Sequence, residues 1–136
     1  MKKVICFCIV VILGSKIALF AQDVNFTKGE LTAVLCKKWK LDYVLDNGIK
    51  FTPPPGKSFN YEFKQDNTFK LTGSGNGGDG IWTYDPDKRQ IKLKINDVSN
   101  TTIISLKEEE LIMLLDTKTA MPSAPTGMKT VFVPSN

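Results

Sequence analysis

Few residues in this chain could carry acid–base, nucleophilic or metal chemistry. None of the 136 residues is a histidine, and two of the three cysteines, Cys6 and Cys8, lie in an apolar N-terminal run. Zinc and iron sites therefore lack a set of ligands, and neither a Ser-His-Asp nor a Cys-His arrangement can be built. We therefore expect that the protein binds no metal and no cofactor and is not an enzyme. A lysine- or tyrosine-based enzyme is the alternative that the composition leaves open.

The carboxylates that lie close together in the sequence are expected to be solvated turn residues. Asp85 and Asp87 flank a proline, and residues 108–110 are three glutamates between two apolar runs. Both positions are typical of hairpin tips. The glycine-rich residues 73–80 lack the Gly-Lys-Ser/Thr ending of a phosphate-binding loop, so we expect a flexible hairpin loop there.

Aromatic residues form the most distinctive pattern, because they alternate with polar residues along several short segments. This alternation predicts an inward-facing set, which we take as the candidate ligand-binding residues: Trp39, Tyr43, Phe59, Tyr61, Phe63, Phe69, Trp82 and Tyr84. An interior lined by these rings could hold one fatty or aromatic molecule. The alternative is a core that the rings fill by themselves, since each ring takes up interior volume. The tyrosine hydroxyls need polar partners if they are buried.

The segments that position these rings read as short strands joined by turns. The expected strands are residues 38–45, 58–64, 68–72, 81–84, 90–95, 101–106, 111–115 and 128–133. Strands at a spacing of about ten residues predict an all-β fold, either a barrel or a sandwich. We expect a single eight-stranded antiparallel up-and-down barrel, because closure removes exposed sheet edges.

Three further segments have distinct signals. In the first strand, Trp39, Leu41, Tyr43 and Leu45 are expected to share the inner face. The prolines at 53–55 make residues 49–57 a loop or a stiff edge segment, and residues 117–127 read as a loop. Thr27 and Glu30 have the spacing of a capping box, which predicts one short helix.

The first 21 residues read as a secretory signal peptide, and residues 22–136 as the mature domain. Two lysines precede an apolar run at 4–13, and Ala21 is a small residue at the expected cleavage site. We therefore expect a periplasmic or secreted protein with no membrane span after cleavage; an uncleaved anchor is the alternative. Removal of the three leader lysines lowers the net charge from +4 to +1. A domain so near neutral gives no electrostatic case for nucleic acid.

Cys36 is the one cysteine of the expected mature domain, so no internal disulfide can form. A lone thiol in an exported protein is either buried as a small apolar side chain or paired with another chain.

The pattern of fixed residues resembles lipocalins, and most closely the small bacterial lipocalin-like domains of exported proteins. It consists of Trp39-x-Leu41, Tyr61-x-Phe63, the turn at 66–68, Gly80-x-Trp82-x-Tyr84 and Ile91-x-Leu93, followed by leucine-rich segments at 103–106 and 111–114. The glycine of the lipocalin Gly-x-Trp is Lys37 here, and the late arginine over the tryptophan is absent. Lys129 is the residue that we expect to stack on Trp39 instead.

The resemblance implies a barrel that can bind apolar ligands. Together with the inward rings, it predicts an exported, non-catalytic binding protein for a small apolar or amphipathic molecule. The alternative is a structural or interaction module, such as an inhibitor or assembly subunit. Such a module would have a filled core and would act through the loops at 53–56 and 121–127.

Overall fold

The computed structural model describes residues 24–73, 77–115 and 127–136, with the side chains of 98–100 left aside. The predicted signal peptide and most of the predicted loop at 117–127 lie outside these residues. The described part contains one helix and nine strands: α1 (Lys28–Leu35), β1 (Lys38–Asp46), β2 (Ile49–Phe51), β3 (Phe59–Phe63), β4 (Thr68–Gly73), β5 (Gly78–Asp85), β6 (Gln90–Ile95), β7 (Val98–Leu106), β8 (Leu111–Leu115) and β9 (Lys129–Pro134).

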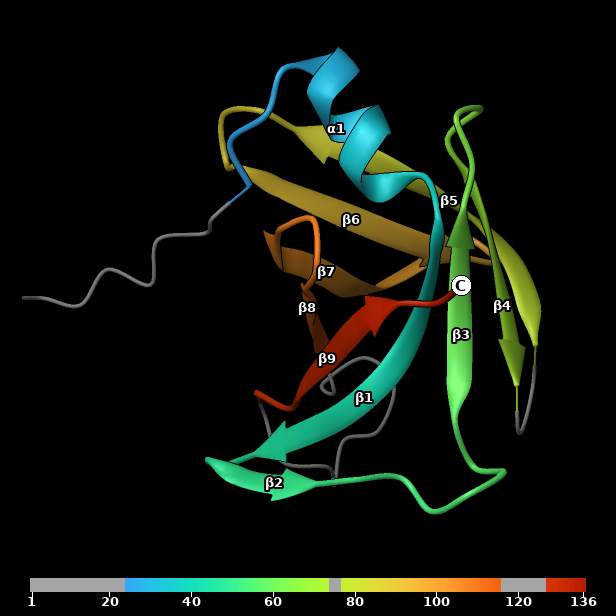
Figure 1. Ribbon diagram of the computed structural model, residues 1–136. Coiled ribbons are helices and arrows are strands. Elements are labelled where there is room, and N and C mark those ends of the chain that lie inside the picture. The colour runs from blue at the N-terminus through green and yellow to red at the C-terminus, as the bar shows by residue number, and fades with distance from the viewer. Residues whose placement is uncertain (1–23, 74–76, 116–126) are drawn as a thin grey trace, which may run out of the picture.

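Eight of the strands form a closed antiparallel barrel, as predicted. β1 pairs with β3, each following strand pairs with the next, and β9 returns to pair with β1 from Trp39–Pro134 to Leu45–Lys129. β2 lies outside this ring, because it pairs only with the end of β1. The β1–β2 hairpin therefore extends beyond one end of the barrel, while α1 lies over the other end (Figure 1).

The helix forms at its predicted place and closes its end of the barrel. The Thr27 side chain accepts a hydrogen bond from the Glu30 N–H at 3.4 Å, and a Glu30 carboxylate oxygen accepts one from the Thr27 N–H at 2.9 Å. The Thr27 hydroxyl also donates to this carboxylate at 2.7 Å, and this bond first, then the bond from the Thr27 N–H, lowers the pKa of Glu30. On the inner side, Leu31 and Leu35 are buried with Trp39, whose ring N–H donates to the Leu35 carbonyl at 3.0 Å.

A β-bulge in β1 reverses which residues face inward in the second half of this strand, contrary to the prediction. The register against β9 shifts between Leu41 and Tyr43, so that one extra residue enters β1 there. Val44 consequently packs against the core, and Tyr43 lies on the outer face, with the Lys50 ammonium 4.0 Å from its ring centre. The prediction that Tyr43 and Leu45 face inward is therefore wrong, because alternation continues in the opposite phase after the bulge.

The glycine-rich segment also differs from its prediction, because β5 begins inside it. Gly78 pairs with Leu71, and Gly80 pairs with Phe69. A Cβ at Gly80 would lie 2.3 Å from the Phe69 ring and 2.4 Å from the Lys94 carbonyl oxygen. Glycine is thus needed at position 80 so that an inward ring can lie directly against the backbone of the neighbouring strand.

We expect Gly80→Ala to destabilise the barrel by roughly 1–3 kcal/mol, because the added methyl must displace a packed ring and a backbone carbonyl. Gly78→Ala is the matched control, since its Cβ would meet only the Ile95 side chain at an ordinary 3.7 Å. Urea unfolding of both variants measures the difference. Equal stability of the two variants would contradict the close packing of Phe69 on Gly80.

Candidate functional site

The inward side chains become more exposed from the α1 end of the barrel toward the β1–β2 end. Along β3, Phe63 and Tyr61 are 2% and 7% exposed, whereas Phe59, nearest the hairpin, is half-buried. Other strands repeat this order, with buried residues near α1 and a half-buried residue at the far end: Trp39, Leu41 and then Val44; Ile91, Leu93 and then Ile95; Leu111, Met113 and then Leu115. As far as the described residues go, the interior is therefore filled beneath α1 and open at the other end.

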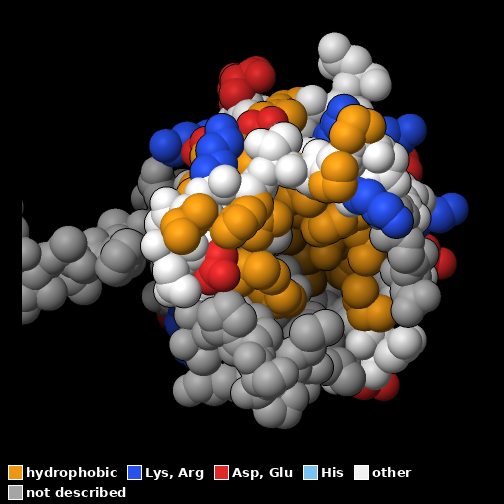
Figure 2. All heavy atoms as spheres, turned by 90° about the horizontal axis from the view of Figure 1, so that it is seen from below, with side chains coloured by type: hydrophobic (Ala, Val, Ile, Leu, Met, Phe, Trp, Pro, Cys, Tyr) orange, Lys and Arg blue, Asp and Glu red, His pale blue; other side chains and the backbone are white. Residues whose placement is uncertain are grey.

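A hollow with apolar walls lies at this open end. Figure 2 looks into it from below and shows hydrophobic side chains across its floor and along its upper, left and right sides. We assign its walls to four half-buried residues that pack against the core at the ends of their strands away from α1. These are Val44, Phe59, Leu71 and Ile95. We take this hollow as the candidate functional site.

A cluster of aromatic rings lies where the filled part of the interior meets the open part. The Tyr61 ring has four aromatic neighbours with centres 5.4–6.1 Å away: Phe59, Phe63, Phe69 and Phe132. Phe63 is stacked on Tyr61, while Phe59 and Phe132 meet it edge-on. Such contacts hold the tyrosine ring in one orientation.

The Tyr61 hydroxyl is the polar group of this cluster. Among the described residues it has no hydrogen-bond partner, although 93% of the side chain is buried. The side chain lies on the inner face of the barrel, with Phe59 as its neighbour toward the open end. Burial raises the pKa of Tyr61 to about 12, because the charged phenolate would lose its hydration.

The β1–β2 hairpin supplies an apolar rim beside the hollow. Phe51 pairs with Val44 and therefore lies on the same face, the one that continues the inner surface of the barrel. Ile49, two residues earlier, shares that face. Ile49 is 61% exposed and Phe51 is 52% exposed, which is unusual for large apolar residues.

The predicted ligand-binding residues divide into three groups. Phe59, Tyr61, Phe63 and Phe69 come together at or beneath the hollow. Trp39, Trp82 and Tyr84 lie toward α1, where their polar atoms donate to carbonyls: Trp82 to Lys64 at 3.1 Å, and Tyr84 to Val24 and Phe26 at 3.4 and 3.3 Å. Tyr43 lies outside the barrel.

Some residues of the site escaped the prediction. The prediction omits Phe132, because Val131 and Val133 on either side of it are also apolar and do not show which face it takes. The prolines that follow Ile49 and Phe51 predict a loop or a stiff edge segment there, and neither residue is among the predicted ligand-binding residues.

The cation over Trp39 is Lys37, not Lys129 as predicted. The Lys37 ammonium lies 4.9 Å from the centre of the Trp39 ring and donates to the Glu108 carbonyl at 2.8 Å. Lys129 pairs with Leu45, at the opposite end of β1 from Trp39. The residue that replaces the glycine of the lipocalin pattern therefore supplies the cation–π contact itself.

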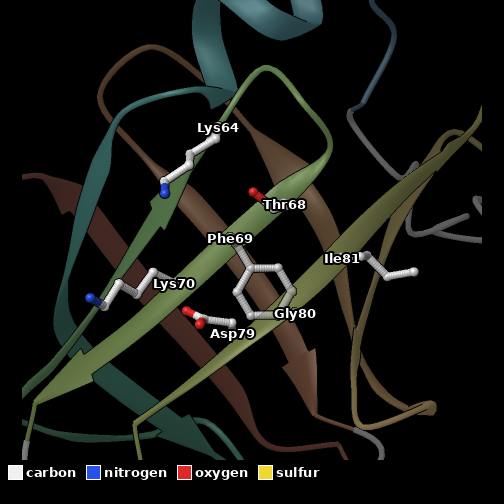
Figure 3. A pocket seen from close by; sticks show the side chains of 7 residues that line it. All are labelled: Lys64, Thr68, Phe69, Lys70, Asp79, Gly80 and Ile81. Atoms are coloured by element: carbon white, nitrogen blue, oxygen red, sulfur yellow. The ribbon is translucent and has the colours of Figure 1, made fainter.

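Other concave surfaces lie on the outside of the described structure, and two of them differ clearly from the hollow. One, of about 450 Å³, lies on the wall at β4 and β5 and is lined by Lys64, Thr68, Phe69, Lys70, Asp79, Gly80 and Ile81 (Figure 3). The other, of about 600 Å³, lies beside α1 and includes Phe26, Lys28 and Asn67. The first carries the lysines of the outer wall, whereas the hollow at the open end is apolar.

Within residues 24–73, 77–115 and 127–136, no group of three or more acidic, cysteine or histidine side chains is placed to hold a metal ion. The helix in that part of the chain, α1, is not long and apolar enough to cross a membrane. Cys36 follows α1 and is half-buried; burial, and secondarily the charge of Asp66, raise the pKa of its thiol.

Comparison with known proteins gives a likeness of fold. No protein-family model and no curated protein matches the sequence. The crystal structure of a DUF4847 family protein from Bacteroides vulgatus ATCC 8482 superimposes with a TM-score of 0.52 and 14% sequence identity, over 77% of this chain and 96% of that one. That is a likeness of fold alone. It supports a barrel of this kind and leaves the lipocalin resemblance as a prediction.

The raised pKa of Tyr61 predicts a loss of stability in alkali. The unfolded chain ionises this phenol near pH 10, whereas the folded protein keeps it protonated to about pH 12. The contribution of Tyr61 to the free energy of unfolding is therefore complete below pH 10 and falls as the pH rises toward 12. Urea unfolding between pH 9 and 11 should show a steeper decline for the wild type than for Tyr61→Phe. Parallel declines would mean that the phenol is as well solvated as in the unfolded chain.

Proposed function

We propose that the protein is a non-catalytic binding protein for a small apolar or amphipathic molecule, held in the hollow at the open end of the barrel. The gradient of exposure along the inner face carries this proposal: rings and aliphatic side chains fill the α1 end and leave apolar walls uncovered at the other. A core that its own side chains fill throughout would bury Val44, Phe59 and Ile95 as completely as it buries Trp39 and Ile91.

The affinity in this proposal comes from removing apolar surface from water. A ligand in the hollow would cover the half-buried residues of β1, β3, β4 and β6, and the exposed Phe51 would close over part of it. Pockets for small molecules usually combine such walls with a few polar groups that fix orientation. Among the described residues, Tyr61 supplies one such polar group at the floor.

A second candidate function rests on the same rim. Ile49 and Phe51 are large apolar side chains exposed on a three-residue strand, and such side chains are also typical of protein interaction sites. In this alternative the protein acts as an inhibitor or assembly subunit through the hairpin and the proline loop that follows it. Binding of small molecules in the hollow distinguishes the two, because the alternative does not require it.

Leu71→Trp should block the hollow while leaving the fold intact. Leu71 is half-buried and faces Gly78 across the β4–β5 pair, so a larger side chain would extend into the open space. We expect binding of the neutral fluorescent probe N-phenyl-1-naphthylamine to weaken at least about tenfold, which corresponds to about 1.4 kcal/mol of lost contact.

Thr72→Trp is the matched control, since Thr72 is exposed on the outer face of the same strand. Circular dichroism and thermal unfolding check that both variants fold. Equal probe binding by the two variants would place the probe outside the hollow, and no binding to the wild type would favour the interaction module.

We further propose that the protein is exported with cleavage after residue 21. Expression of the full chain in a bacterial host with a secretion system, followed by intact-mass measurement, should give a periplasmic or medium fraction whose mass begins at Gln22. A full-length mass in the membrane fraction would support the uncleaved anchor instead.

A further inference from the structure

We infer that the ligand of the hollow carries an uncharged oxygen acceptor, such as a ketone or ester carbonyl, and that this group accepts a hydrogen bond from the Tyr61 hydroxyl. The inference rests on the proposed binding function and names the class of ligand. It predicts a molecule that enters with its carbonyl end first and leaves its apolar end among the half-buried residues of the rim.

The placement of Tyr61 carries the first step. Its side chain lies one inward position beyond Phe59, counted from the open end along β3, and is 7% exposed. The hydroxyl has no hydrogen-bond partner among the described residues, and the side chain lies on the inner face of the barrel. A buried hydroxyl without a partner has lost the hydrogen bonds that it makes in water. A group that enters the hollow and accepts a hydrogen bond from this hydroxyl restores one of them.

The rigidity of the ring carries the second step. Four aromatic neighbours within 6.1 Å fix the Tyr61 ring, so the hydroxyl direction is set before any ligand arrives. A donor that is already oriented loses little conformational freedom when it binds. The same site built on an exposed tyrosine would have to order that side chain first.

The lack of charged side chains on the inner face of the described strands around Tyr61 favours an uncharged ligand group. Among the described residues, the inward side chains of β1 as far as Val44 and of β3, β4 and β6 are uncharged, because the lysines of these strands alternate onto the outer face. The charge on the inner side is Asp46, which pairs with Ile49 at the rim and would repel an anion. On these described strands a carboxylate buried at Tyr61 would meet no cation to offset its lost hydration, whereas a carbonyl needs none. The phenol also stays protonated at neutral pH, so it can donate.

The test compares three naphthalene probes of nearly equal shape. These are 2-acetylnaphthalene, which carries the carbonyl, 2-ethylnaphthalene, which lacks it, and 2-naphthoate, which is an anion. Equilibrium dialysis measures their affinities for the wild type, for Tyr61→Phe and for Tyr43→Phe. The last variant removes a hydroxyl from the outer face and serves as the matched control.

We expect Tyr61→Phe to weaken 2-acetylnaphthalene binding about three- to tenfold, the usual effect of one neutral hydrogen bond, and to change 2-ethylnaphthalene binding less than about twofold. Tyr43→Phe should change neither affinity, and 2-naphthoate should bind the wild type more weakly than the ketone. Circular dichroism confirms that the variants fold, and Tyr61→Leu, which also lacks a donor, replaces Tyr61→Phe if the latter does not fold.

Three outcomes would overturn the inference, and they separate it from the proposed function. Equal effects of Tyr61→Phe on the ketone and the hydrocarbon would show that the hydroxyl does not select the ligand, while binding in the hollow stands. Stronger binding of 2-naphthoate than of the ketone would show that the site accepts anions. Failure of all three probes to bind the wild type would overturn the binding function and this inference together.

Discussion

The pairing of β1 with β9 is the constraint on which the rest of the structure depends. It joins the first wall strand to the last, from Trp39–Pro134 to Leu45–Lys129, and converts a row of hairpins into a closed ring. Closure leaves no free edge in the wall itself and creates the interior that the aromatic rings occupy. The bulge within this pairing also decides that Val44 lines the hollow and that Tyr43 does not.

The two ends of the ring differ because different segments precede and follow β1. Before β1, a capped helix places Leu31 and Leu35 over the interior, and Trp39 and Tyr84 donate hydrogen bonds to backbone carbonyls there. After β1, the chain turns into the short β2, whose apolar side chains stand beside an opening that they do not fill. A binding site at one end of a small barrel requires this asymmetry, since an interior closed at both ends would admit no ligand.

The sequence predicted the wall strands well where polar and apolar residues alternate without interruption, as in residues 58–64, 68–72 and 90–95. It could not reveal the bulge in β1, because Tyr43, Val44 and Leu45 are all apolar and fit either phase. The predicted start of β5, at residue 81, is too late, because Gly78 and Gly80 have no side chain from which alternation can be read. The same limits apply to the site. Phe59, Tyr61, Phe63 and Phe69 follow from period-two alternation, but the open end depends on where β2 and α1 lie, which only the three-dimensional arrangement reveals.

Closure by the last strand has a kinetic consequence. Trp39 and Pro134 are partners although 94 positions of the chain separate them, and both edges of the ring stay unpaired until residues 129–134 take part. Contacts so distant in sequence make folding slow, since a long loop must be ordered before they form. A chain that lacks β9 would expose the strand edges of β1 and β8 together with the inner aromatic face, which is the condition that favours aggregation over folding.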